Sequence, residues 1–129
     1  MKTVYVMALS AAAGIAIGAA AVQTLHAQTM SPGFLVAEID VSNVEAYNKE
    51  FLPLASKALA AGGAKFLVRG GKHVAIDGAA PPQRVVVSQF ESLEKAVATY
   101  QSAEYREARK IGDKYAKFRI WAAEGVEQK

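Results

Sequence analysis

Between residues 33 and 125, extended and helical patterns follow one another in an order that few folds can accommodate. Four short segments rich in Val, Ile, Leu and Phe are separated by two segments with apolar residues at helical spacing. The predicted elements are a strand at 33–41, a helix at 44–61, strands at 65–69 and 84–90, a helix at 93–111 and a strand at 118–123. The order is therefore β-α-β-β-α-β.

The first helix is predicted from both its ends and its periodicity. Ser42 and Glu45 have the spacing of a capping box, and Gly62-Gly63 supplies the left-handed residue that often ends a helix. Pro53 lacks a backbone donor, so we expect a kink there. The apolar residues that recur at three- and four-residue steps are Val44, Tyr47, Phe51, Leu54, Ala55, Ala58 and Leu59.

The second helix is expected in two pieces. Ser92 caps its start, and Ser102 restarts it after a break. The residues predicted to face inward are Leu93, Ala96, Val97, Tyr100, Tyr105, Ala108 and Ile111.

The segment between the second and third strands bends at Gly70-Gly71-Lys72. We expect residues 73–76 to continue as a short extended arm before the turn signals at Asp77-Gly78 and Pro81-Pro82.

Right-handed crossovers place both helices on one face of a four-stranded antiparallel sheet. This predicts an α+β, ferredoxin-like fold. A sheet covered on one face normally shows polar residues on the other, but these strands are apolar on both, as in Phe34-Leu35-Val36 and Val85-Val86-Val87. We therefore expect a homodimer in which two such sheets pack face to face.

Residues 1–27 have the features of a cleavable signal peptide. Lys2 precedes an uncharged run from Val4 to Val22, and Leu25 and Ala27 would occupy the −3 and −1 positions of a cleavage after Ala27. Cleavage would leave one domain, residues 28–129, in the periplasm or secreted. The alternative is an uncleaved membrane anchor, because 19 uncharged residues approach the ~20 that a spanning helix needs.

Composition excludes several classes of function. The chain has no cysteine, which rules out disulfides, thiolate catalysis and cysteine-ligated metal sites. The net charge is +3, but the basic residues of the second helix alternate with acidic ones, which disfavours nucleic-acid binding. No cluster of His and carboxylate residues predicts a metal site, and no cofactor is expected.

Several segments of the chain resemble the domain-of-unknown-function 1330 (DUF1330) family over roughly residues 33–125. They are Val36-x-Glu38-x-Asp40-Val41, Tyr47, Gly62-Gly63, Phe66-Leu67-Val68-Arg69-Gly70-Gly71, Arg84-Val85-Val86-Val87, Phe90, Ser102-x-x-Tyr105 and Arg109. The resemblance implies a dimeric α/β-barrel. The family's usual Leu-Glu-Gly appears here as Ile76-Asp77-Gly78, and a frequent Trp is Tyr100.

Dimeric α/β-barrels generally hold a pocket between sheet and helices or loops, which directs attention to eight polar residues. Glu38 is a carboxylate in an apolar strand and needs a partner, for which Arg69 and Arg84 are the candidates. Such a group is either a structural ion pair at the dimer interface or an anchor for a small acidic or carbonyl ligand. His73, four residues before Asp77, is either a solvated loop residue or an acid–base group. The full set of pocket candidates is Glu38, Tyr47, Arg69, His73, Asp77, Arg84, Tyr105 and Arg109.

Three classes of function remain open at the level of sequence. The leading prediction is a protein with a small-molecule pocket, which would either bind its ligand or act on it. An enzyme of the cofactor-independent monooxygenase or isomerase type is suggested only by analogy with other dimeric α/β-barrels. A non-catalytic interaction module would instead have its inter-sheet space filled by side chains.

Overall fold

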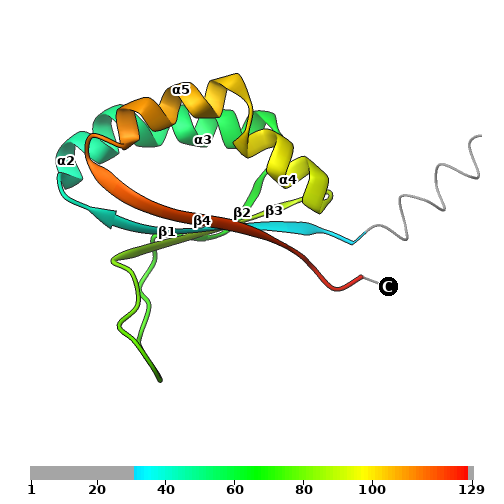
Figure 1. Cartoon of the computed structure of the whole chain (residues 1–129), viewed down its shortest axis with the longest axis horizontal. Coiled ribbons are helices and arrows are strands. Elements are labelled where there is room, and N and C mark those ends of the chain that lie inside the picture. The colour runs from blue at the N-terminus through cyan, green and yellow to red at the C-terminus, as the bar shows by residue number, and fades with distance from the viewer. Residues whose placement is uncertain (1–30, 128–129) are drawn as a thin grey trace, which may run out of the picture. The chain divides into compact units, whose positions relative to one another are not determined.

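The computed structural model describes residues 31–127 (Figure 1), and within them the predicted element order is confirmed. The elements are β1 (Gly33–Val41), α2 (Val44–Ala46), η1 (Tyr47–Phe51), α3 (Leu52–Ala61), β2 (Lys65–Arg69), β3 (Arg84–Phe90), α4 (Leu93–Tyr100), α5 (Ala103–Gly112) and β4 (Ala116–Glu124). The signal-peptide prediction concerns residues 1–27, which lie outside the described residues. No helix within the described part is both long and apolar enough to cross a membrane.

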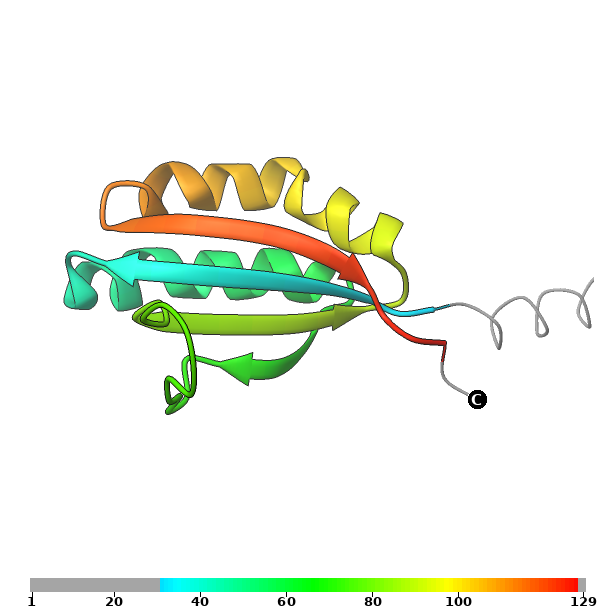
Figure 2. The same cartoon turned by 60° about the horizontal axis from the view of Figure 1, so that its bottom comes forward.

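The four strands form one antiparallel sheet in the order β2-β3-β1-β4, with all the helices on one face (Figure 2). This is the predicted ferredoxin-like α+β fold. The register places Leu35, Ala37 and Ile39 of the central strand β1 toward the helices. The even-numbered residues Phe34, Val36 and Glu38 therefore lie on the face that the helices leave open.

The first helix is less regular than its sequence pattern predicts. Asn43, and not Ser42, is the N-cap, since its side chain accepts a hydrogen bond from Ala46 N at 3.1 Å. Ser42 instead donates its hydroxyl to Tyr115 O at 2.9 Å. The expected disturbance at Pro53 takes the form of a π-helical segment, η1, that ends two residues before the proline. Gly63, with φ +89°, follows the C-cap of α3.

The break in the second helix is confirmed, and both parts begin with a serine cap. Ser92 Oγ accepts from Lys95 N at 3.1 Å, and Ser102 Oγ accepts from Tyr105 N at 3.3 Å. Val97 is exposed, contrary to the expected inward orientation, as are Val44 and Leu54 of the first helical region.

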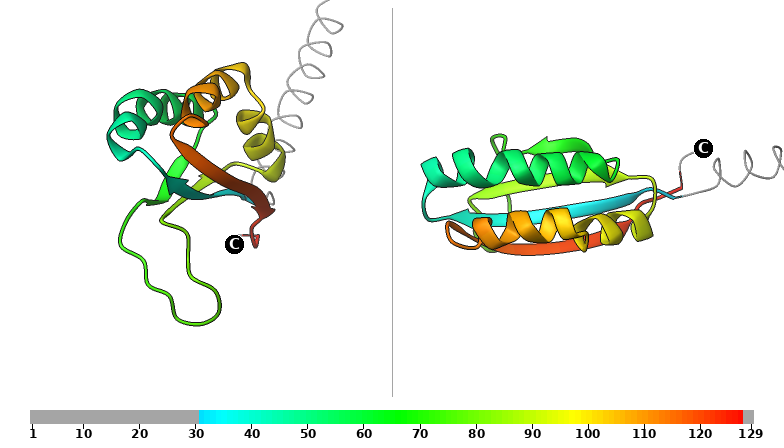
Figure 3. Two further views of the ribbon diagram at one scale, coloured as in Figure 1. Left: turned by 60° about the vertical axis from the view of Figure 1, so that its left-hand side comes forward. Right: turned by 90° about the horizontal axis from the view of Figure 1, so that it is seen from above.

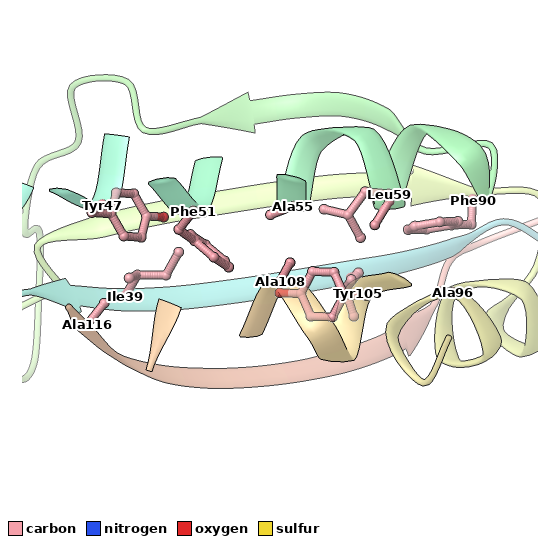
Figure 4. Close-up of a cluster of buried hydrophobic side chains, with 12 residues drawn as sticks. Ile39, Tyr47, Phe51, Ala55, Leu59, Phe90, Ala96, Tyr105, Ala108 and Ala116 are labelled. Carbon is pink, nitrogen blue, oxygen red and sulfur yellow. The ribbon is translucent and has the colours of Figure 1, made fainter. Parts of the chain in front are cut away.

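The core lies between the helices and the sheet (Figure 4). Tyr47 and Phe51 of η1 continue into Ala55 and Leu59 of α3, and Tyr105 approaches from α5. The rings of Tyr47 and Phe51 lie with centroids 5.1 Å apart, and Phe51 meets Phe118 of β4 edge-on at 5.3 Å.

The connection from β2 to β3, residues 70–83, extends away from the sheet on the side opposite the helices (Figure 3). The expected extended arm at 73–76 is not a strand, and Val74 and Ile76 are 72% and 96% exposed. β4 starts at Ala116, two residues before its predicted start.

Candidate functional site

A cavity lies between the helix-facing side of the sheet, η1 and α3. It leaves about 40 Å³ of space for water-sized groups. Because one water needs roughly 10–15 Å³ of such space, this is room for about three small groups. Its lining is mostly apolar, with five polar side chains that come from five different elements. The lining residues are Ala37, Ile39, Tyr47, Phe51, Leu52, Ala55, Ser56, Leu59, Phe66, Arg69, Arg84, Val86, Tyr105 and Phe118.

Arg84 is the more deeply placed of the two basic residues in this cavity. Its register position opposite Ile39 of β1 directs it toward the helices. The guanidinium carbon lies 5.6 Å from the centroid of the Tyr47 ring. Arg84 Nε is buried and has no hydrogen-bond partner among the described residues. A buried donor without a partner is uncommon and therefore identifies a position where an acceptor would be favourable.

Arg69 lies at the exposed rim of the same cavity. It donates from Nη2 to Ser56 Oγ at 2.6 Å, and its guanidinium lies 4.4 Å from the centroid of the Phe66 ring. A bulge between Phe66 and Val68 adds one residue to β2 and turns Arg69 to the helix side, where Phe66 already lies. Simple alternation along 65–69 would place Phe66 and Val68 on one face, and the bulge places them on opposite faces.

Tyr47 and Tyr105 are buried at 1% and 4% exposure. Burial raises the pKa of Tyr47, and the charge and hydrogen bond of Arg84 offset part of that effect. Burial also raises the pKa of Tyr105 to about 12, against a smaller opposing effect of Arg109. Both phenols therefore stay protonated at neutral pH and can donate hydrogen bonds but cannot serve as bases.

Glu38 lies outside this cavity, on the open face of the sheet. Neither Arg69 nor Arg84, its two expected partners, pairs with it, because both side chains lie on the opposite face. Its carboxylate accepts from Trp121 Nε1 at 3.2 Å and pairs with Arg119 Nε at 3.5 Å. The carboxylate thus ties β1 to its neighbour β4.

His73 and Asp77 lie in the exposed loop between β2 and β3, away from the cavity. The ring of His73 contacts backbone carbonyl groups and not the Asp77 carboxylate, although the two residues are four positions apart. The ring joins the two arms of the loop, with Nδ1 at 3.2 Å from Gly71 O and Nε2 at 2.7 Å from Pro82 O. This arrangement is a structural brace for the loop.

Arg109 clamps α5 to its neighbours. It donates from Nη1 to the Tyr100 hydroxyl at 2.7 Å, pairs with Asp113 at 2.9 Å and lies 3.9 Å from the centroid of the Phe118 ring. The spacing of Ser102, Tyr105 and Arg109 is explained by a cap, a buried ring and this clamp, and Arg109 does not line the cavity.

Two residues of the site were not among the sequence candidates. Ser56 accepts a hydrogen bond from Arg69. The only signal for this role in the sequence is its position one turn after Leu52, on the inner side of α3. Gly70 has φ +68°, and a Cβ there would come within 2.3 Å of Arg84 Nη1. The Gly70-Gly71 pair was the available signal, but by itself it predicts only a bend in the chain.

The chemistry available in the cavity is narrow. Its titratable side chains are two arginines and two tyrosines, with no carboxylate and no histidine in the lining. Among residues 31–127 no group of three or more metal-ligating side chains occurs. The cavity therefore offers positive charge and hydrogen-bond donors beside apolar walls.

Comparison with known proteins gives a family and a fold. The family model described as "Domain of unknown function (DUF1330)" matches residues 32–126. No curated protein is detectably similar in sequence. A crystal structure of a protein of unknown function from Rhodopseudomonas palustris is similar with a TM-score of 0.61 and 15% identity, over 76% of this chain and 85% of that one. At this identity the likeness concerns the fold alone.

Two weaker structural likenesses have TM-scores below 0.5. One is to a protein from Bacteroides thetaiotaomicron described as a possible oxidoreductase, with a TM-score of 0.47 and 14% identity over 73% of this chain and 97% of that one. The other is to a conserved protein from Methanosarcina mazei, with a TM-score of 0.48 and 14% identity over 77% of this chain and 97% of that one.

Proposed function

Since the chain belongs to the DUF1330 family, whose name states that its function is unknown, we propose a function from the cavity: the domain binds a small organic molecule between its sheet and α3. The observation that carries this proposal is the convergence of Tyr47, Arg69, Arg84 and Tyr105 on one apolar cavity. Small-molecule sites typically combine apolar walls with a few polar groups that fix orientation.

Binding is favoured over acid–base catalysis by the residues that line the cavity. A general base must be able to take a proton near neutral pH. The tyrosines have raised pKa values, and arginines stay protonated, so neither type meets this requirement. Turnover would therefore have to depend on groups of the ligand itself.

The proposal is tested by filling the cavity from its rim. Ser56→Leu adds three non-polar carbons at the rim and removes the acceptor of Arg69, whereas Ala60→Leu adds apolar bulk on an exposed position of the same helix. Neutral, acidic and basic small organic molecules are titrated one by one into the protein. We expect at least one of these classes to shift the backbone amide resonances of α3 and β2 in a saturable way. Overpacking costs about 1–3 kcal/mol, so Ser56→Leu should weaken that binding about tenfold or more.

The Ala60→Leu protein provides the control and should bind like the wild type. A protein whose amides respond to none of these molecules would refute the proposal. Equal binding by the Ser56→Leu variant would also refute it, because the ligand would then lie elsewhere.

We further propose that the protein acts outside the cytoplasm and as a pair. Export is supported by the uncharged run from Val4 to Val22 and the cleavage pattern ending at Ala27. Pairing is supported by the open face of the sheet, because apolar side chains at the centre of an uncovered sheet favour a protein partner. This open face consists of Phe34, Val36, Val85, Val87 and Trp121. Trp121 is 47% exposed.

A further inference from the structure

We infer that the group bound in the cavity is a carboxylate, held by Arg69 and Arg84 and attached to a small apolar residue of the ligand. This inference rests on the proposed binding function and names the chemical class of the ligand. Four features of the cavity support it.

The first feature is an uncompensated positive charge. Arg69 and Arg84 both line the cavity, and no acidic side chain lines it with them. The ion pairs formed among residues 31–127 join Arg109 to Asp113, Lys110 to Glu107 and Arg119 to Glu38, and they include neither cavity arginine. Buried charges are normally paired, so the half-buried guanidinium of Arg84, with Arg69 beside it at the rim, favours an anion from outside.

The second feature is the orphaned donor of Arg84. Its Nε is buried without a hydrogen-bond partner in the described part of the chain. Together with a neighbouring Nη, the Nε–H of an arginine forms a planar fork that matches the two oxygens of a carboxylate. A carboxylate would satisfy this donor and neutralise the charge in one step.

The third feature is the fixed position of the Arg84 guanidinium. The backbone at Gly70 approaches it so closely that a Cβ would lie 2.3 Å from Nη1 and 2.4 Å from Cζ. The Tyr47 ring packs near it at 5.6 Å. A cation held in this way loses little conformational entropy when it binds an anion, so its affinity is correspondingly higher.

The fourth feature is the size and polarity of the remaining space. The space of about 40 Å³ accommodates the three non-hydrogen atoms of a carboxylate, so the rest of the acid would extend past Arg69 at the exposed rim. The walls next to the arginines are apolar, including Phe51, Leu59 and Val86. A phosphate would bring more charge and a larger tetrahedral group into the same space, so the planar, singly charged acid fits better.

The test compares matched acids and amides on the protein as it is purified from an expressing bacterium. Acetate, butyrate and benzoate are titrated by calorimetry or by amide resonance shifts, alongside acetamide, butyramide, benzamide and inorganic phosphate. Each acid has the shape of its amide but differs in charge. We expect each acid to bind at least about tenfold more tightly than its amide, because hydrogen bonds to charged groups are the stronger ones.

Variants then assign the effect to the two arginines. Arg84→Gln should weaken binding of the acids on the order of tenfold to a hundredfold. Arg69→Gln should weaken it less, because this side chain lies at the exposed rim. Arg106→Gln removes the same charge from an exposed position of α5 and should change the affinity less than about twofold. If Arg84→Gln does not fold, Arg84→Lys replaces it, because lysine keeps the charge but loses the planar fork. Weaker binding of the acids by Arg84→Lys and by Arg69→Gln would then assign the effect to the two arginines.

The outcomes separate this inference from the function beneath it. Acids and amides that bind equally, or phosphate that binds more tightly than the acids, would overturn the carboxylate assignment and leave a small-molecule cavity in place. An acid preference that persists unchanged in both Arg69→Gln and the Arg84 variant would overturn it as well. If no acid, amide or phosphate binds, the carboxylate inference fails. If the wild-type protein also binds none of the neutral, acidic and basic molecules titrated alongside Ser56→Leu, the proposed binding function fails too.

Discussion

At the scale of single residues, the cavity combines two arginines with two buried tyrosines. Burial keeps the phenols neutral, so the arginines provide all the formal charge of the lining. The remaining sequence candidates serve the fold: Glu38 links β1 to β4, His73 braces a loop, and Arg109 clamps α5. The same residue types thus have different roles because they lie on different faces of one sheet and its connections.

Tyr105 gives a prediction about stability at high pH. Its pKa is raised from 10.0 to about 12 by burial, so the folded state keeps the phenol protonated at a pH where the unfolded chain has already ionised it. The stability associated with the neutral phenol is complete below pH 10 and is lost as the pH rises toward 12, for a total of roughly 2–3 kcal/mol. Denaturant unfolding at several pH values measures it.

Tyr105→Phe cannot ionise at this position and should lack that part of the decline. Lysine and tyrosine titration elsewhere affects both proteins equally, so the difference between them is the quantity of interest. Parallel curves for the two proteins between pH 10 and 12 would show that the pKa of Tyr105 is not raised by folding.

At the scale of elements, the edge strand β2 and the loop after it shape the cavity. The bulge between Phe66 and Val68 turns Arg69 toward α3, and Gly70 then brings the chain against Arg84. One irregular strand and one left-handed residue thus bring together two arginines that are 15 positions apart. The rest of the loop extends away from the sheet, on the side opposite the helices (Figure 3).

The two adjacent glycines at the start of this loop provide a matched pair of substitutions. Gly70 has φ +68° and would place a Cβ against Arg84, whereas Gly71 has no atom within 4 Å of such a Cβ. Gly70→Ala should lower the free energy of unfolding by about 1–2 kcal/mol, because an L-residue is disfavoured in the left-handed region. Gly71→Ala should be close to neutral.

Urea denaturation of both variants measures these costs, and the affinity for benzoate gives a second readout. Gly70→Ala should also weaken benzoate binding, since Arg84 has to move. Equal destabilisation by the two substitutions would show that the close approach at Gly70 is not important for stability.

At the scale of the whole molecule, the sheet has two different faces. The helices cover one face with an apolar core, and the other carries Val36 at its centre between Val87 and Trp121. Glu38 and Arg119 form an ion pair on the same open face. The β2–β3 loop extends on this side as well (Figure 1).

Native mass spectrometry of protein purified from an expressing bacterium tests export and pairing together. We expect the wild type to be a dimer whose mass corresponds to a chain starting at Gln28. Val36→Arg places a charge at the centre of the open face and should weaken the dimer by about 2–5 kcal/mol, leaving a processed monomer. Leu54→Arg, on the exposed outer side of α3, should remain a dimer.

A wild-type monomer would refute the pairing, and a mass that includes residues 1–27 would support the membrane-anchor alternative. Loss of the dimer in both variants would indicate general destabilisation, which circular dichroism of the Val36→Arg protein checks.

Much of the fold was predictable from local patterns. The helices could be predicted because helical spacing, the serine caps at 92 and 102 and the glycines at 62–63 depend only on residues close in sequence. The order of six elements with right-handed crossovers then leads to one sheet topology. The capping residue of the first helix was misassigned by one position, since Ser42 and Asn43 are both good caps and a tertiary contact to Tyr115 decides between them.

The site was predictable only in its residue types. Sequence alone identified Arg69, Arg84, Tyr47 and Tyr105 as candidates, but it grouped them with Glu38, His73 and Asp77, which lie elsewhere. The face on which a strand residue lies depends on register, and a single added residue in β2 reverses it. Only the tertiary structure decided which charges meet, because strand pairing and the approach of Gly70 to Arg84 join segments that are distant along the chain.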